Sequence, residues 1–146
     1  MKKILVIHGP NLHLLGKREP EIYGRATLEA INSGLQKIAR AKKIKLTVAQ
    51  SDYEGRIVEL IGKSKNKYDG LLINPAAYTH TSVAIRDAIA GSGIITVEVH
   101  LSNINSREEF RHKSLISPVA KGTVMGFGPK SYELGLLALI DLLNAK

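Results

Sequence analysis

Short apolar runs alternate with helix-like patterns along the whole chain. Residues 4–7 form a continuous apolar run, which is typical of a strand covered on both faces. Residues 44–48 alternate apolar and polar, which predicts a strand with one wet face at a sheet edge. With the runs at 70–73, 94–97 and 123–127, the pattern predicts five strands.

Between these runs, apolar residues recur at helical spacing. The clearest case follows Thr27, a residue suited to capping a helix, after which leucines and isoleucines are spaced by three, four and three. We expect helices after Thr27, after a cap at Ser51 or Asp52, at 79–90, around 106–113, and along an apolar stripe from Tyr132 to Leu143.

Strands that alternate with helices predict an α/β fold with right-handed crossovers and a doubly wound parallel sheet. Because the second strand is the alternating one, we place it at an edge and expect the flavodoxin-like order 2-1-3-4-5 with three layers. The chain has no internal repeat, low-complexity tract or linker, so residues 1–146 are expected to form a single catalytic domain.

Composition narrows the class of protein. No apolar run approaches the roughly 20 residues that cross a bilayer, and the N-terminal run is too short for a secretory signal. Cysteine is absent, which removes disulfides and thiolate chemistry. We therefore expect a cytoplasmic protein.

The net charge of +8 has two interpretations, a nucleic-acid partner or an anionic substrate. Lysines and arginines at 37–45 and 63–67 cluster where helices are expected to end, and cations favour helix C-termini. The chain has few aromatic residues, five Tyr and two Phe, and no nucleic-acid-binding motif, which favours the anionic substrate.

Polar residues gather at the carboxyl ends of three predicted strands, where doubly wound sheets bind ligands. They are Asn11, Asn74, His80, Glu98, His100 and Ser102. Glu98 and His100 are two residues apart, so on a strand they point to the same side. A carboxylate orients an imidazole and favours its protonated form, which suits a proton donor. A single histidine here would as readily cap a helix or fill a turn, but convergence from three strands favours a site.

Residues 11–25 have no hydrophobic period, which predicts a functional lid or binding loop. Tyr23 lies in this segment, and a loop tyrosine is more often merely exposed. Arg18 offers another interpretation, because a nearby guanidinium stabilises phenolate. The chain lacks phosphate-binding glycine loops, a nucleophile elbow and metal-ligand spacings, so cofactor-free acid–base chemistry remains.

Three segments, at residues 9–24, 74–82 and 98–112, resemble the signature sequences of the type II 3-dehydroquinate dehydratases. The resemblance spans essentially the whole chain. It implies a flavodoxin-like fold and conversion of 3-dehydroquinate to 3-dehydroshikimate in the shikimate or quinate pathway. It also implies that no metal or cofactor is needed, and that trimers assemble into a dodecamer.

The resemblance also implies roles for individual residues. Tyr23 would be the base, kept ionised by Arg18. His100 would be the acid with Glu98 as its partner, and Asn11 would hold a water on the enolate. The substrate-binding residues would be Leu101 and Ser102 for the carboxylate, Asn74, His80 and Arg111 for ring hydroxyls, and Asp87 reaching a neighbouring subunit's site.

Two positions depart from the family pattern: His13 stands where many members have Asn, and Ser131 where glycine is usual. Two other functions compete with this interpretation. A flavin- or phosphate-binding module would need a phosphate-cradling first loop, yet Pro10 and Asn11 stand there. A nucleic-acid-binding domain would rest on the helix-end lysines alone.

Overall fold

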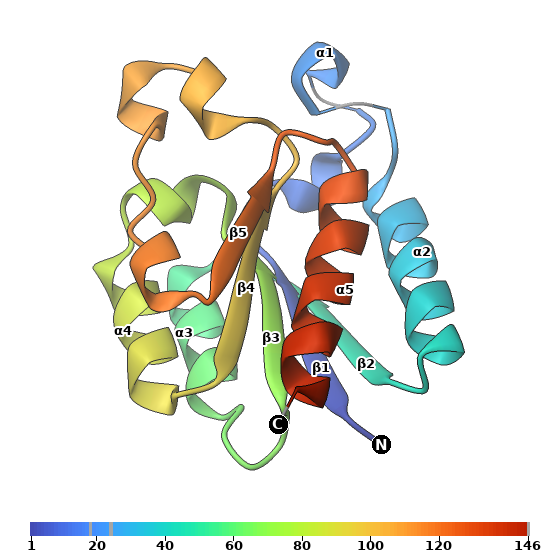
Figure 1. Ribbon diagram of the computed structural model, residues 1–146. Helices are drawn as coiled ribbons and strands as arrows, with labels where there is room; N and C mark the ends of the chain where they lie inside the picture. The colour runs from blue at the N-terminus through green and yellow to red at the C-terminus, as the bar shows by residue number, and fades with distance from the viewer. Residues whose placement is uncertain (18, 24, 146) are drawn as a thin grey trace.

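Five parallel strands form the central sheet, in a computed structural model that describes residues 1–17, 19–23 and 25–145, without the side chain of Tyr23. Their order is β2-β1-β3-β4-β5 (Figure 1), which confirms the predicted flavodoxin-like arrangement. The strands are β1 (Lys3–His8), β2 (Lys45–Gln50), β3 (Gly70–Asn74), β4 (Ile95–His100) and β5 (Gly122–Met125).

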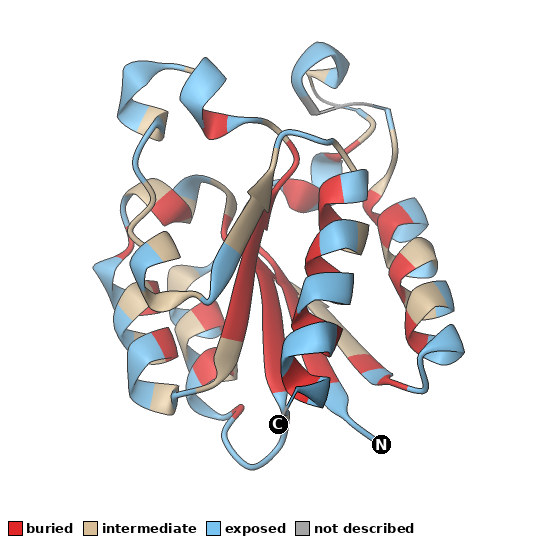
Figure 2. Ribbon diagram, in the orientation of Figure 1, coloured by how far each residue is buried: buried red, intermediate tan, exposed pale blue. Residues whose placement is uncertain are grey.

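Helices cover both faces of the sheet, as the alternating pattern predicts. In Figure 1, α2 (Leu28–Ala41) and α5 (Lys130–Asn144) lie on one face, and α3 (Glu54–Gly62) and α4 (Val83–Ser92) on the other. Each face has its own apolar cluster, and the central strands separate the two (Figure 2). No helix in the described ranges has both the length and the apolar composition to cross a membrane.

Most residues of the predicted apolar runs are buried, although Phe127, at the end of the fifth run, is 64% exposed. The apolar residues of β1 and β3 are at most 2% exposed, whereas β2 is mostly half-buried, as expected for an edge strand. The stripe on α5 from Tyr132 to Leu143 packs against β3 and β4. Burial of one such large side chain stabilises the fold by about 1.5–3 kcal/mol.

Two predicted helix starts are wrong. Tyr53, rather than Ser51 or Asp52, precedes α3, and the Ser51 hydroxyl instead accepts the backbone N–H of Tyr53 in a turn. The helix expected to begin at Thr79 begins at Val83, because the Ser82 hydroxyl caps it by accepting the N–H of Ile85. The residues before it form a 3-10 helix, η2 (Ala76–His80).

Other short segments also differ from the prediction. The polar stretch expected as one short helix forms two 3-10 turns, η3 (Ile104–Ser106) and η4 (Glu109–Arg111). A third turn, η5 (Ser117–Val119), precedes β5. The segment expected to lack structure contains η1 (Leu12–Leu14) and α1 (Pro20–Tyr23), and Leu12 and Leu15 are buried in the core. The base of this segment is therefore anchored by apolar packing.

Candidate active site

A cavity of about 250 Å³ opens at the carboxyl edge of the sheet. The segments that follow β1, β3 and β4 line it, because parallel strands end at the same edge. The predicted site residues among its lining are Asn11, Asn74, His80, His100, Leu101, Ser102 and Arg111. Five of the six residues predicted to converge from three strand ends therefore line one cavity, and Glu98 is the exception, while the role of each residue remains a prediction.

Close packing of two strand ends shapes the cavity wall. The backbone N–H of Gly9 donates to the Asn74 carbonyl oxygen at 2.8 Å. A Cβ atom on Gly9 would lie 2.5 Å from the Pro75 carbonyl oxygen, so only glycine fits here. Asn11 follows in the left-handed region, with φ of 68°, and its N–H donates to Asp52 at 2.9 Å.

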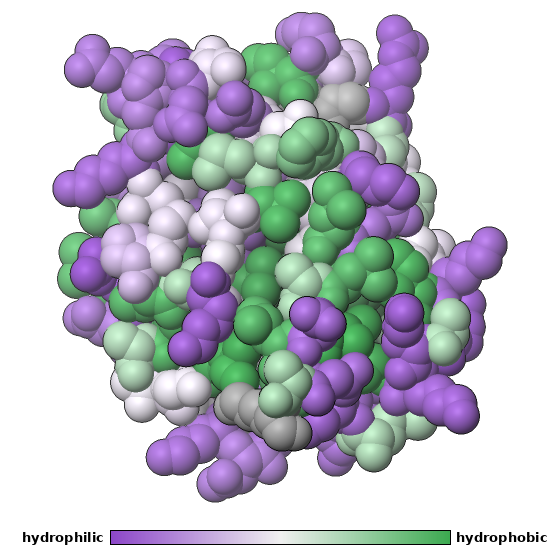
Figure 3. All heavy atoms as spheres, in the orientation of Figure 1, coloured by the Kyte–Doolittle hydropathy of each residue, from purple (hydrophilic) through white to green (hydrophobic). Residues whose placement is uncertain are grey.

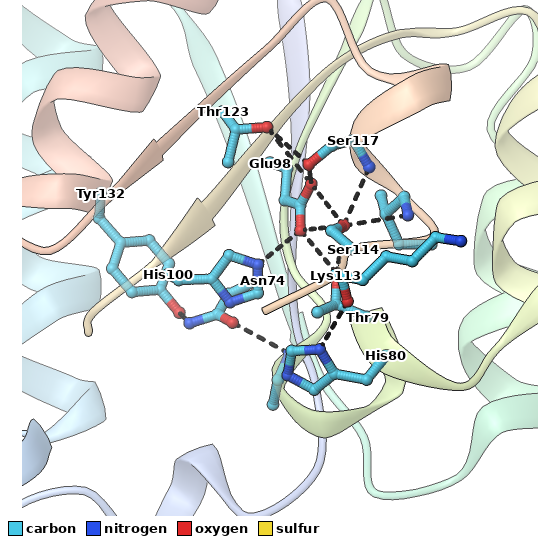
Figure 4. A network of polar contacts seen from close by, with 12 residues as sticks. Asn74, Thr79, His80, Glu98, His100, Lys113, Ser114, Ser117, Thr123 and Tyr132 are labelled. Atoms are coloured by element: carbon cyan, nitrogen blue, oxygen red, sulfur yellow. Dashed lines mark hydrogen bonds and ion pairs between the residues drawn. The ribbon is translucent and has the colours of Figure 1, made fainter. Parts of the chain in front are cut away.

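His100 and Glu98 form a buried pair on β4. Their side chains point to the same side of the strand, as predicted, and His100 Nε2 lies 2.5 Å from Glu98 Oε2 (Figure 4). Glu98 is fully buried and His100 is 5% exposed. Glu98 is not itself among the cavity lining, so it contacts His100 rather than the cavity.

Four hydroxyl groups surround the Glu98 carboxylate, an arrangement that the sequence analysis missed. Thr79 donates to Oε2 at 2.6 Å and Ser117 to Oε1 at 2.6 Å, while Ser114 reaches both oxygens and Thr123 lies 3.4 Å from Oε1 (Figure 4). Burial alone would raise the pKa of Glu98. Interactions with His100, and hydrogen bonds from Ser117 and Thr79, outweigh this effect and lower the pKa to about 2.

This carboxylate fixes the state of the His100 ring. An ionised carboxylate only accepts hydrogen bonds, so Nε2 carries a hydrogen. Among the described residues, none hydrogen-bonds the other ring nitrogen, Nδ1. Because His100 lines the cavity, Nδ1 is the ring nitrogen available to exchange a proton with a ligand.

His80 lines the same cavity, but its hydrogen bond to the protein uses Nδ1, whereas that of His100 uses Nε2. Its Nδ1 donates to the Lys113 carbonyl oxygen at 2.8 Å (Figure 4), since a carbonyl only accepts. Partial burial lowers the pKa of His80, and the hydrogen bond to Lys113 only partly opposes this effect. The neutral ring therefore keeps a lone pair on Nε2 that suits a hydroxyl ligand.

Two arginines give the cavity a positive wall. Arg107 and Arg111 line it, and both guanidinium groups are held by Glu108, with Arg111 Nε 3.0 Å from the carboxylate. No carboxylate occurs among the described lining residues. This wall favours an anionic ligand. Arg107 was not predicted, although it lies inside the third signature segment.

Besides Glu98, three predicted site residues are not found among the cavity lining. Arg18 falls outside the described residues, and so does the side chain of Tyr23. Helix α1, which ends at Tyr23, borders the site. Two of its residues, Glu21 and Ile22, line an adjoining hollow of about 510 Å³ together with Ser102 and Arg107. Asp87 lies exposed on α4 and is not among the cavity lining.

The buried His8 and Glu98 should make folding stability depend on pH. Burial lowers the pKa of His8 from 6.5 to about 4, so between these values the unfolded chain binds a proton that the folded chain does not. The free energy of unfolding should therefore fall as the pH drops through this window, by about 3 kcal/mol from His8 at 1.36 kcal/mol per unit. Glu98 extends the loss from its ordinary 4.5 down to about 2.

Urea unfolding at pH 7, 5.5 and 4 tests the His8 contribution. His8→Asn removes the titrating ring, so the variant should lose less stability between pH 7 and 4 than the parent. His112→Asn is the control, because His112 is exposed and bonds a backbone carbonyl rather than a carboxylate, so the slope should be unchanged. Equal slopes in the parent and His8→Asn would contradict the prediction.

Comparison with known proteins agrees with the fold and the signature segments. The sequence profile of the family described as dehydroquinase class II matches residues 2–140. Proteins named 3-dehydroquinate dehydratase from Trichodesmium erythraeum and Geotalea daltonii are 60% and 56% identical, over 97% and 95% of this chain and 94% and 96% of their own length. The crystal structure of a type II dehydroquinase from Butyrivibrio crossotus superposes with a TM-score of 0.92 at 46% identity, over 98% of this chain and 97% of that one. This chain therefore belongs to the class II dehydroquinase family.

Proposed function

We propose that this chain dehydrates 3-dehydroquinate to 3-dehydroshikimate by an anti elimination through an enolate, with Tyr23 as base and His100 as acid. Family membership carries the reaction. The mechanism rests on the geometry of His100, which lines the cavity, is hydrogen-bonded through Nε2 to the buried, ionised Glu98, and has no described residue bonded to Nδ1. The step belongs to the shikimate pathway.

The first step removes a carbon-bound proton next to the ketone. Such a proton is weakly acidic, so a phenolate is a more effective base than a carboxylate. Tyr23 supplies the phenolate, and Arg18, five residues earlier, keeps it ionised and steadies the enolate. The position of α1 beside the hollow at Ser102 and Arg107 supports this assignment, since Tyr23 is the last residue of that helix.

The second step expels the hydroxyl group as water. The imidazolium form of His100 donates its Nδ1 proton to the departing oxygen, while Nε2 stays hydrogen-bonded to Glu98. The four hydroxyls around Glu98 hold the carboxylate in place, so the ring keeps one orientation through the cycle. Asn11, whose side chain borders the cavity, holds a water that donates to the enolate oxygen.

Substrate binding uses the rest of the lining. The backbone N–H groups of Leu101 and Ser102, with the Ser102 hydroxyl, bind the carboxylate, and the positive wall of the cavity draws it in. Asn74, His80 and Arg111 bind the ring hydroxyls, for which the Nε2 lone pair of His80 is a suitable acceptor.

The working enzyme is a homo-oligomer, in which trimers form a dodecamer and Asp87 reaches the site of an adjacent subunit. An exposed apolar surface supports assembly: Leu134, Leu137 and Leu142 on α5 are each about 40% exposed. Figure 3 shows hydrophobic side chains gathered over this helix. Each subunit is one catalytic domain that acts in the cytoplasm without metal or cofactor.

A direct assay tests this function. Purified protein mixed with 3-dehydroquinate should produce the ultraviolet absorbance of the conjugated enone in 3-dehydroshikimate. The rate should be unchanged after dialysis against EDTA, and the protein should be colourless. Absence of the enone signal at micromolar enzyme would overturn the proposed function, and loss of rate with EDTA would overturn its cofactor independence.

A further inference from the structure

A chain of four polar side chains runs through the core beneath the cavity, and the reaction as derived above does not use most of it. It connects Asn32 on α2, His8 on β1, Tyr132 on α5 and Asn74 on β3. His8 Nε2 lies 2.7 Å from Asn32 Oδ1, and His8 Nδ1 lies 2.8 Å from the Tyr132 hydroxyl. Asn74 Nδ2 lies 3.1 Å from the same hydroxyl (Figure 4).

The chemistry of these groups gives the chain one direction. An amide oxygen only accepts, so the His8 hydrogen is on Nε2 and is donated to Asn32. Burial lowers the pKa of His8 to about 4, against the opposing hydrogen bond to Asn32, so the ring is neutral and Nδ1 is an acceptor. The Tyr132 hydroxyl therefore donates to His8, and its oxygen accepts from Asn74.

This direction of donation determines which way the side-chain amide of Asn74 is oriented toward the cavity. Its Oδ1 accepts the backbone N–H of Ala76 at 3.0 Å, and one hydrogen of Nδ2 goes to Tyr132. The second hydrogen of Nδ2 has no partner among the described residues and remains for a ligand. If the amide turned over, its nitrogen would face the N–H of Ala76, and its oxygen would face a tyrosine whose hydrogen already points to His8.

We propose that His8 and Tyr132 are positioning residues for substrate binding, which hold the Asn74 amide so that it offers an N–H to an oxygen of the substrate. The inference rests on the proposed function and adds two residues to it that do not line the cavity. A fixed donor selects a substrate with an oxygen acceptor at this position, and a freely rotating amide would present its own oxygen part of the time.

Burial makes a purely space-filling role a poor explanation. His8 and Tyr132 are fully buried and Asn74 is 2% exposed, in a layer otherwise filled mainly by leucine, isoleucine and valine. Burial of polar groups costs free energy that apolar residues of similar size would not cost. The chain also ends on a residue that lines the cavity rather than closing on itself within the core.

Steady-state kinetics of five variants test the inference. Tyr132→Phe and His8→Leu each break the chain, and each should raise the KM for 3-dehydroquinate about tenfold, with kcat changed less than about threefold, since one oriented hydrogen bond is lost. His8→Asn places an acceptor near the former Nδ1 and should restore KM to near the parent value. Tyr132→Phe combined with Asn74→Ala should be no worse than Asn74→Ala alone, because the hydroxyl acts through that amide.

Thr96→Val is the matched control, since it deletes a buried hydroxyl at the end of β4 away from His100, and this hydroxyl bonds no described group other than the Ile94 carbonyl. It should lower the melting temperature without changing KM. If Tyr132→Phe and His8→Leu behave like Thr96→Val, the chain is merely structural and the inference is wrong. If Tyr132→Phe does not fold, His8→Leu against His8→Asn makes the same comparison. A parent enzyme without turnover would instead overturn the proposed function, and this inference with it.

Discussion

Tyr23→Phe is expected to reduce turnover of 3-dehydroquinate by about 10²–10⁴-fold, the usual contribution of one general base. The substitution deletes only the phenol oxygen, which is the proposed proton acceptor. No other base among the described cavity residues is suited to the task, because none of them is a carboxylate and imidazole is a weaker base than phenolate. The melting temperature should stay within about 2 °C of the parent, since Tyr23 ends the four-residue helix α1, whose other three residues are exposed.

Deuterium exchange gives this prediction a sharper readout than turnover. Removal of the carbon-bound proton precedes elimination, so Tyr23→Phe in D₂O should lose enzyme-catalysed incorporation of deuterium into the unreacted substrate as well as product formation. Tyr68→Phe is the control, because Tyr68 precedes β3 and so lies at the amino-terminal end of the strands, opposite the end that bears the cavity. Near-normal turnover in Tyr23→Phe would show that another group is the base.

The sheet was predictable because its signals are local. Continuous apolar runs mark strands buried on both faces, and β1, β3 and β4 are indeed buried, while the one alternating run became the edge strand β2. Given parallel strands, the polar residues at their carboxyl ends had to share an edge. The meeting of Asn11, Asn74 and His100 therefore followed from pattern and topology together.

The helix starts were less predictable, because several residues near each start are able to cap. Ser51, Asp52, Thr79 and Ser82 all have side chains that accept backbone N–H groups, and only the packed structure selects among them. Thr79 shows the reason: its hydroxyl donates to Glu98 and is therefore committed to the site. A sequence pattern does not show this competition.

The hydroxyl groups that surround Glu98 could not be predicted from the sequence either. Its four hydroxyl partners come from η2, from the segment before η5, from η5 itself and from β5, and serines and threonines are too common for any spacing among them to stand out. The His8–Tyr132 contact joins residues 124 positions apart. Family membership, rather than composition, decides against the flavin-binding and nucleic-acid-binding interpretations of the fold and the charge.

His100→Ala should also lower turnover by about 10²–10⁴-fold, but through the second step. The variant lacks the Nδ1 proton donor, whereas Tyr23 and the enolate-binding groups remain. In D₂O it should therefore still exchange the substrate proton for deuterium while product formation stalls, the opposite of Tyr23→Phe. Glu98 keeps its bonds to Thr79, Ser114 and Ser117, so the carboxylate stays hydrogen-bonded and the fold should persist.

A change of leaving group in the substrate tests whether His100 acts as an acid or only positions the substrate. A substrate analogue with fluoride in place of the departing hydroxyl needs no proton to expel its leaving group, so parent and His100→Ala should process it at rates within about tenfold of each other, because the acid term no longer applies. His112→Ala is the control, since His112 is exposed, bonds no described group other than the Arg107 carbonyl and should leave both reactions unchanged. A His100→Ala defect of equal size on both substrates would mean that the ring positions the substrate and that the proton comes from elsewhere.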